Sequence, residues 1–164
     1  MTNTGGPVVH LLCGYSGAGK TTHAKHLEKV TMGVRFSLDE WMIQLHPELS
    51  YQSQLYGIRA EACKWVIWDV ALQFLQRGVD VILDWNQWSR VRRSVWRDAA
   101  ESAGFNTRLH FVDVRIETAL HRSANRAADR TAGSHRLAPE DVRSFVDIFE
   151  PPSPDEGIPL TVIP

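Results

Sequence analysis

The stretch Gly14-Tyr15-Ser16-Gly17-Ala18-Gly19-Lys20-Thr21 determines how the rest of the chain is interpreted, because it fits the pattern G-x-x-x-x-G-K-[ST] at every fixed position. In such a loop, successive backbone N–H groups converge on a polyphosphate, and glycines let the backbone approach it closely. The pattern predicts that Lys20 reaches the β- and γ-phosphates and that the Thr21 hydroxyl ligates Mg²⁺. The predicted nucleotide-binding residues are Gly14, Ser16, Gly17, Ala18, Gly19, Lys20, Thr21 and Thr22.

The segments on either side of this loop have the character of a strand and a helix. Residues 8–12, Val-Val-His-Leu-Leu, form a short and mostly apolar run that is typical of a buried parallel strand. From Thr21 the chain continues with Ala24 and Leu27 on one predicted helix face, and Gly33 is expected to end that helix. A loop between a strand and a helix is the context that the motif requires.

The bulk composition limits the classes of protein that the chain can belong to. Its 164 residues predict a single domain spanning 1–164. The net charge of −1, from 18 basic and 19 acidic residues, argues against a protein built mainly to hold duplex nucleic acid. Two cysteines without C-x-x-C spacing fit a reducing compartment. With no transmembrane-length apolar run and no leader-like start, we expect a cytoplasmic protein without a membrane partner.

Two further predicted strands end in a carboxylate. Residues 34–38 alternate apolar and polar side chains and lead into Asp39, which either caps the following helix or points into the crevice at the strand ends. Residues 79–84 are predicted to form a buried strand that ends in Asp84. A phosphate-binding fold needs a carboxylate opposite the threonine hydroxyl, so Thr21 and Asp84 are the predicted metal site.

Two helices are predicted from apolar spacing. The first runs from about residue 51 or 55 to Gln76, and the second from about 89 to 103. Their predicted inward residues are Ile58, Ala62, Trp65, Leu72 and Leu75 in the first and Val91, Val95 and Ala99 in the second. A row of Arg90, Arg93 and Arg97 falls on another face and is interpreted mainly as solvated charge.

The remaining chain completes an alternating pattern. It predicts a strand at 107–114, a helix at 116–128, a mobile loop at 131–136, a helix from Pro139 to about Phe149, an extended connector at 150–157 and a strand at 160–163. Five strands alternating with helices imply a parallel sheet covered on both faces, which is an α/β fold.

Taken in order, these motifs resemble the small P-loop kinases of the nucleoside-monophosphate-kinase-like group. The most similar subset is the AAA-type ATP-binding or predicted kinases, related to chloramphenicol phosphotransferase, zeta toxins and polynucleotide kinase domains. The resemblance rests on residues 14–22, 36–40, 81–84, 149–156 and on the pair Arg122 and Arg126.

The resemblance implies a three-layer P-loop NTPase fold with strand order 2-3-1-4-5, a lid at about 116–138, and ATP with Mg²⁺ as cofactors. It makes Asp39 the residue that faces the acceptor hydroxyl, and Arg126, with Arg122 or Arg130, the cation over the transferred phosphate. The implied catalytic set is Lys20, Asp39 and Arg126, with Arg122 and Arg126 also contacting the nucleotide. Several members carry Asp-x-x-Arg after the second strand, whereas this chain has Met42 at the arginine position.

Three functions remain open at this point. The first is a kinase that phosphorylates a hydroxyl of a small molecule such as a sugar, nucleoside or antibiotic, with predicted contacts from Asp39, Trp41, Trp85, Trp88 and Arg90. The second is a polynucleotide 5′-hydroxyl kinase, against which the near-zero net charge and Met42 argue. The third is a non-catalytic ATP-binding regulatory module. The sequence indicates no oligomeric state.

Overall fold

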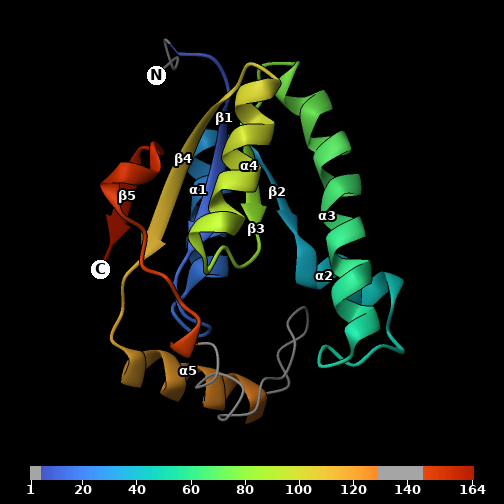
Figure 1. Cartoon of the computed structure of the whole chain (residues 1–164), viewed down its shortest axis with the longest axis vertical. Coiled ribbons are helices and arrows are strands. Elements are labelled where there is room, and N and C mark those ends of the chain that lie inside the picture. Colours follow the sequence, from blue (N-terminus) through green and yellow to red (C-terminus); the bar gives the residue numbers. More distant parts are fainter. Residues whose placement is uncertain (1–4, 129–145) are drawn as a thin grey trace.

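The computed structural model describes residues 5–128 and 146–164, which form a five-stranded parallel sheet (Figure 1). The strands are β1 (Val8–Cys13), β2 (Val34–Ser37), β3 (Val81–Asp84), β4 (Asn106–Val112) and β5 (Leu160–Ile163). They lie in the order β2-β3-β1-β4-β5, and every neighbouring pair is parallel. The predicted fold class and strand order are therefore confirmed.

Helices cover both faces of this sheet. They are α1 (Lys20–Thr31), α2 (Leu38–Leu45), α3 (Gln54–Leu75), α4 (Arg90–Ser102) and α5 (Ile116–Ala128), and a 3₁₀ turn, η1 (Pro154–Glu156), precedes β5. The larger core joins α3 and α4 to alternate residues of β1 and β3, and a smaller cluster packs α1 against the other face. No helix in the described ranges is both long enough and apolar enough to cross a membrane.

The parallel register brings the predicted chemistry to one edge of the sheet. Leu11 of β1 pairs with Leu83 of β3, and Ser37 of β2 pairs with Asp84. The loop after β1, the end of β3 and the start of α2 therefore meet where the strands end, which is where ligands bind in open α/β sheets.

The buried faces of α3 and α4 differ from the prediction. Ile58 and Trp65 of α3 are exposed, and so are Val91 and Val95 of α4. The prediction for Leu75 is confirmed, and the other covered positions are Ala60, Cys63, Lys64, Ile67, Trp68 and Ala71 in α3 and Arg93, Trp96 and Ala100 in α4. Both helices carry apolar residues on two sides, so apolar spacing alone does not fix which side faces the sheet.

Several local boundaries also differ. Ser37, not Asp39, is the N-cap of α2, because its side chain accepts a hydrogen bond from the backbone N–H of Glu40. Asp39 instead lies in the first turn, where a carboxylate is favoured by the helix dipole. α1 ends at Met32, which adopts the left-handed conformation with φ of 55°, rather than at Gly33.

The closing segment is more than an extended connector. Ser153 and Glu156 form a capping box around η1, and the Glu156 side chain is buried. The predicted loop at 131–136, the helix from Pro139, Arg130 and much of the proposed lid lie outside the described residues.

A row of histidines crosses the face of the sheet that α1 covers. His10 of β1 lies 3.3 Å from the carboxylate of Asp80 and 2.9 Å from His110 of β4, and His110 lies 3.1 Å from His23 of α1. Since an ionised Asp80 can only accept, His10 donates to it through Nε2, and each further neutral ring donates through Nε2 to the ring before it. Ring nitrogens this close leave no space for a metal between them, and the described residues contain no three-residue metal-ligand cluster.

Candidate functional site

The phosphate loop, residues 14–21, takes a backbone conformation that its glycines make possible. Gly14, Gly17 and Gly19 have φ values of 145°, 88° and 109°. A Cβ at Gly14 would lie 2.7 Å from the carbonyl oxygen of Val112, and one at Gly17 only 2.1 Å from that of Ala119. The loop is thus seated against the end of β4 and the first turns of α5, and it has no space for larger residues at these two positions.

The other end of the loop opens toward solvent. Gly19 is the N-cap of α1, and a Cβ there would meet no described atom within 4 Å. The first N–H groups of a helix have no partner within the helix, and they carry the positive end of its dipole. Since Thr21 and Thr22 are exposed at this terminus, the arrangement suits an anion such as a phosphate.

Lys20 is folded back along the loop. Its ammonium donates hydrogen bonds to the carbonyl oxygens of Gly14, at 2.9 Å, and of Tyr15, at 2.8 Å. These contacts hold a positive charge over the loop that the sequence predicts to surround a polyphosphate.

Thr21 and Asp84 come together as the predicted metal site requires. The Thr21 hydroxyl donates to Oδ1 of Asp84 across 3.3 Å, although the two residues are 63 positions apart. Burial raises the pKa of Asp84, the neighbouring Arg35 and Lys20 charges oppose that rise, and the charge of Asp39 adds to it. A hydroxyl and a carboxylate are hard oxygen donors of the kind that Mg²⁺ prefers, so the residues present fit this ion.

Arg35 is a site residue that the sequence analysis missed. Its guanidinium donates to Oδ2 of Asp84 and to Oε1 of Glu40, both at 2.8 Å. The alternation of side chains along β2 could have placed Arg35 near Asp84. Arg35 and Ser37 point to the same face of β2, and Ser37 pairs with Asp84. Arg35 therefore counterbalances the two carboxylates at this edge.

Asp39 lies within electrostatic range of the same edge. Its charge is among the causes, after burial, that raise the pKa of Asp84 and of Tyr56. The first turn of α2 thus presents a carboxylate beside the predicted metal site, and its role toward an acceptor stays a prediction.

The lid arginines are described only in part. Arg122 of α5 donates to the carbonyl oxygen of Ala18 in the phosphate loop at 3.4 Å. Arg126 lies on the same helix, but its side chain is outside the described part of the chain. The base of α5 is therefore joined to the loop by Arg122 and by the close packing at Gly17.

The predicted acceptor contacts are scattered. Trp85 is only 6% exposed and packs against Trp96 in the core, which does not fit its predicted contact with an acceptor. Trp41 is half-buried and packs edge-on against Phe36, whereas half-buried Trp88 lies under the guanidinium of Arg92 at 4.7 Å. Trp41 and Trp88 remain candidates for contact with an acceptor.

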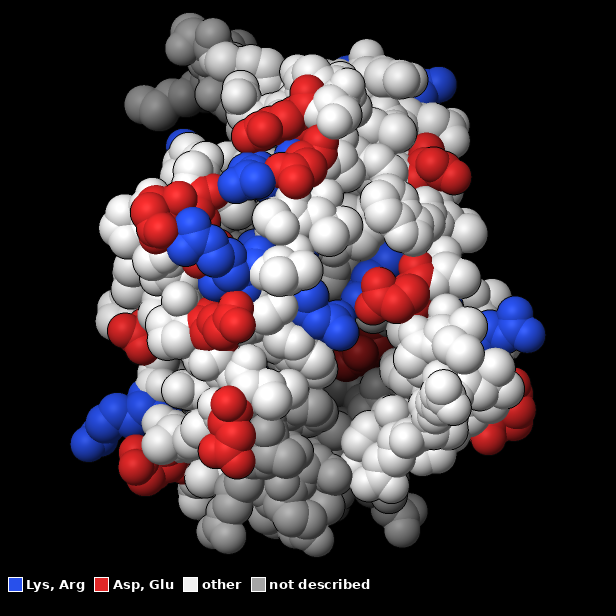
Figure 2. Space-filling view, viewed as in Figure 1, with Lys and Arg blue, Asp and Glu red and all other residues white. Residues whose placement is uncertain are grey.

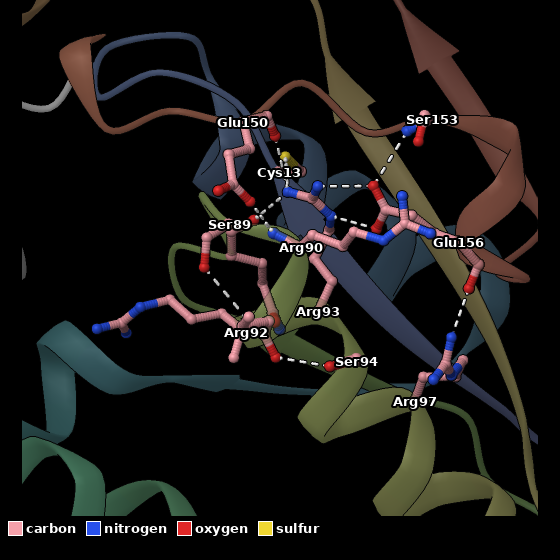
Figure 3. A network of polar contacts seen from close by, with 12 residues as sticks. Cys13, Ser89, Arg90, Arg92, Arg93, Ser94, Arg97, Glu150, Ser153 and Glu156 are labelled. Carbon is pink, nitrogen blue, oxygen red and sulfur yellow. Dashed lines mark hydrogen bonds and ion pairs between the residues drawn. The ribbon is translucent and has the colours of Figure 1, made fainter.

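Arg93 is the centre of a buried network that joins four segments (Figure 3). It is 0% exposed, and its Nε and Nη2 donate to the carboxylate of Glu156 at 2.6 and 2.7 Å. Its Nη1 donates to the carbonyl oxygens of Gln87 and Glu150 at 3.0 and 2.9 Å and contacts the sulfur of Cys13 at 3.7 Å. Although burial raises the pKa of Glu156, the hydrogen bond from Arg93 brings it below its usual value. The network fixes the closing segment against the strand that leads into the phosphate loop.

The other arginines of α4 are also paired. Arg90 binds Asp155 at 2.8 Å, Arg92 lies 3.5 Å from Glu61, and Arg97 binds Asp98 at 2.6 Å. Figure 2 shows basic and acidic side chains next to one another across this face of the molecule. The arginine row is therefore largely neutralised and does not form a continuous basic groove within the described residues.

A parallel sheet of this order, with a glycine loop leading from β1 into α1, defines a P-loop nucleotide-binding fold. The AAA domain family matches residues 9–152, and the chain belongs to that family. No curated protein matches it in sequence.

Solved structures share the fold at low sequence identity. Kti12 of Chaetomium thermophilum, in complex with ADP-AlF3, has a TM-score of 0.71 and 19% identity over 94% of this chain and 88% of its own. A sugar kinase from Janibacter sp. HTCC2649 has a TM-score of 0.63 and 18% identity over 96% of this chain and 84% of its own. A chain of the Pnkp1/Rnl/Hen1 RNA repair complex has a TM-score of 0.68 and 18% identity over 88% of this chain but 44% of its own. Family and fold together support a P-loop ATP-binding protein of the kinase-like group.

Proposed function

We propose that the protein is an ATP-dependent phosphotransferase that moves the γ-phosphate of ATP to a hydroxyl of a small molecule. The observation that carries the proposal is the 3.3 Å contact between Thr21 and Asp84 directly beside Lys20, with a second carboxylate, Asp39, in the first turn of α2, the helix that follows the neighbouring strand. A protein that only binds a nucleotide has no need for this second carboxylate.

The donor side of the reaction uses the loop and the two metal-site residues. Lys20 and the N–H groups at the start of α1 hold the phosphates, while Thr21 and Asp84 hold Mg²⁺. When bound, Mg²⁺ neutralises charge on the β- and γ-phosphate oxygens. Phosphoryl transfer is mainly positioning and charge stabilisation, so few protein groups are required beyond these.

The acceptor side uses Asp39. Its carboxylate orients the acceptor hydroxyl and takes its proton late in the transfer, because a loose transition state needs little help from a strong base. Arg122, already in contact with the loop, and Arg126 of the same helix supply positive charge near the transferred phosphate. Burial raises the pKa of Asp84, and Arg35 opposes that rise through its hydrogen bond to Oδ2, which favours the ionised carboxylate.

The acceptor is proposed to be a ringed polyhydroxy compound such as a sugar, nucleoside or antibiotic. Two half-buried tryptophans, Trp41 and Trp88, offer flat apolar faces close to polar groups. The likeness to a sugar kinase supports this class. The likeness to an RNA repair complex favours a polynucleotide acceptor instead. However, the arginines of α4 are paired with carboxylates, so little positive charge remains on that helix to attract a nucleic-acid strand.

A panel reaction tests the proposal. The protein is incubated with ATP, Mg²⁺ and sugars, nucleosides, hydroxylated antibiotics and 5′-hydroxyl oligonucleotides, and products are examined by mass spectrometry. A small molecule whose mass increases by one phosphate supports the proposal. Phosphorylation of oligonucleotides alone would establish the polynucleotide alternative, and ATP binding without any transfer would favour the regulatory module.

A further inference from the structure

α3 has apolar side chains on two sides, and the described structure covers only one of them. The exposed side carries Leu55, Ile58, Trp65 and Val66, which are 46%, 59%, 47% and 57% exposed. Together with exposed Ala62 they form what we term the α3 outer stripe, residues 55, 58, 62, 65 and 66. In Figure 1, α3 stands at the edge of the molecule.

The outer stripe has the spacing of a helix-packing seam. Its members recur at intervals of three and four residues over three turns, which places them on one side of the helix. Trp65 of the stripe packs against Trp96 of α4 with ring centroids 5.0 Å apart, and Val95, which precedes Trp96 in the chain, is 40% exposed. A contiguous apolar surface of this kind on a folded domain marks an interaction site.

The charges on the stripe identify its occupant. Arg59 and Asp69 are both exposed, on the same side of α3 as the stripe, and neither makes an ion pair with a described residue. In the sequence, Arg59 and Asp69 are each five positions from residue 64, and Ala62 and Val66 are each two positions from it. In an antiparallel pair of α3 helices related by a two-fold axis at that level, each Arg59 faces the Asp69 of the other copy, and each small Ala62 faces a Val66.

We propose that a second copy of this chain docks on the α3 outer stripe, with the two α3 helices antiparallel. The interface is isologous, so two identical charge pairs flank an apolar centre that contains both copies of Trp65. A helix of 22 residues is about 33 Å long, so the interface is narrow and belongs at the low end of stable interface sizes. We therefore expect reversible association, with a dissociation constant in the micromolar range.

Sedimentation velocity of the full chain between about 1 and 100 μM, without nucleotide, tests this proposal. The wild type is expected to shift from monomer to dimer over this range. Arg59→Asp and Asp69→Arg each place like charges opposite one another twice, so each should weaken the dimer at least tenfold. The double variant reverses both pairs and should regain wild-type association.

Lys25→Asp on the exposed surface of α1 is the matched control and should leave association unchanged. Circular dichroism checks that each variant is folded, and a folded Val66→Glu variant should be monomeric. A wild type that is monomeric at every concentration overturns the proposal. A dimer that is insensitive to either single charge reversal, or that the double variant does not restore, also overturns it. Because no step uses ATP, these results are independent of the proposed phosphotransfer.

Discussion

The edge of the sheet at the phosphate loop and the network around Arg93 both join charged groups from distant segments, but they do so in opposite ways. Around Arg93, a buried guanidinium and a buried carboxylate pair with one another, and two carbonyl oxygens accept from Nη1. At the phosphate loop, exposed Thr21 and Thr22, the open space at Gly19 and the start of a helix face solvent. The first arrangement is complete by itself, whereas the second is suited to receive a ligand.

This contrast predicts that substitutions in the two regions separate activity from stability. The largest effect is expected at the phosphate loop. Lys20→Met removes the ammonium that we propose neutralises the transferred phosphate, so kcat/KM should fall about 10²- to 10³-fold. The unfolding midpoint in urea should change little, because Lys20 is only half-buried and its contacts with the carbonyl oxygens of Gly14 and Tyr15 lie within the loop itself. Lys25→Met, one turn further along α1, is the control and should retain full activity.

The Arg93 network should show the reverse. Arg93→Met leaves Glu156 buried without its counter-charge, and we expect the free energy of unfolding to fall by about 3–5 kcal/mol. Arg93→Met combined with Glu156→Leu should lose less than the single variant, since no orphan charge remains. Arg97→Met, at a partly exposed pair, should cost less than about 1 kcal/mol. A double variant as unstable as the sum of its parts would show that the ion pair is not the stabilising unit.

The histidine row predicts a smaller, pH-dependent effect. Burial lowers the pKa of His10, His23 and His110, and it lowers that of His110 to about 3. For His10, the neighbouring Asp80 opposes this decrease and the charge of Arg108 adds to it. The unfolded chain therefore binds more protons below pH 6.5, so the stability present above that pH is lost as the pH falls. The loss attributable to His110 should approach about 1.4 kcal/mol per pH unit.

Urea unfolding at pH 7.5, 6.5 and 5.5 measures this slope. The window lies above the range in which Glu156, whose pKa is lowered, titrates. The comparison with His110→Gln separates the histidine contribution from that of Asp84, whose pKa burial raises. His110→Gln should flatten the slope, and His26→Gln, at an exposed neighbour on α1, should not. An unchanged slope in His110→Gln would remove the histidine row as its cause.

What the sequence could predict follows from how local each signal is. The glycine loop, the acid after β2 and the acid that ends β3 are set by short stretches of chain, so the α/β fold and the meeting of Thr21 with Asp84 could be predicted from them. The strand order was implied by the resemblance to the small P-loop kinases. Arg93 and Glu156 are 63 residues apart, and only the tertiary fold makes their pairing visible. An arginine in a helical row is usually exposed, so its burial contradicts the ordinary expectation.

The outer faces of α3 and α4 could not be assigned for a different reason. Apolar residues lie on both sides of α3, and three of its five predicted inward residues, Ile58, Ala62 and Trp65, lie on the side that the described chain leaves exposed. Trp85 was misplaced because its position after Asp84 suggested the crevice, whereas its ring turns back into the core against Trp96. The proposed α3 dimer would account for the apolar character of the exposed side.

The central claim is that Asp39 converts a nucleotide-binding edge into a phosphotransfer site. Its most direct test compares wild type with Asp39→Asn, an isosteric change that removes the charge. Once the panel has identified the acceptor, ATP affinity and the single-turnover rate of transfer are measured for both proteins. We predict that Asp39→Asn binds ATP within about threefold of wild type and loses transfer by at least about 10²-fold. An Asp39→Asn protein that transfers phosphate at the wild-type rate would contradict the account.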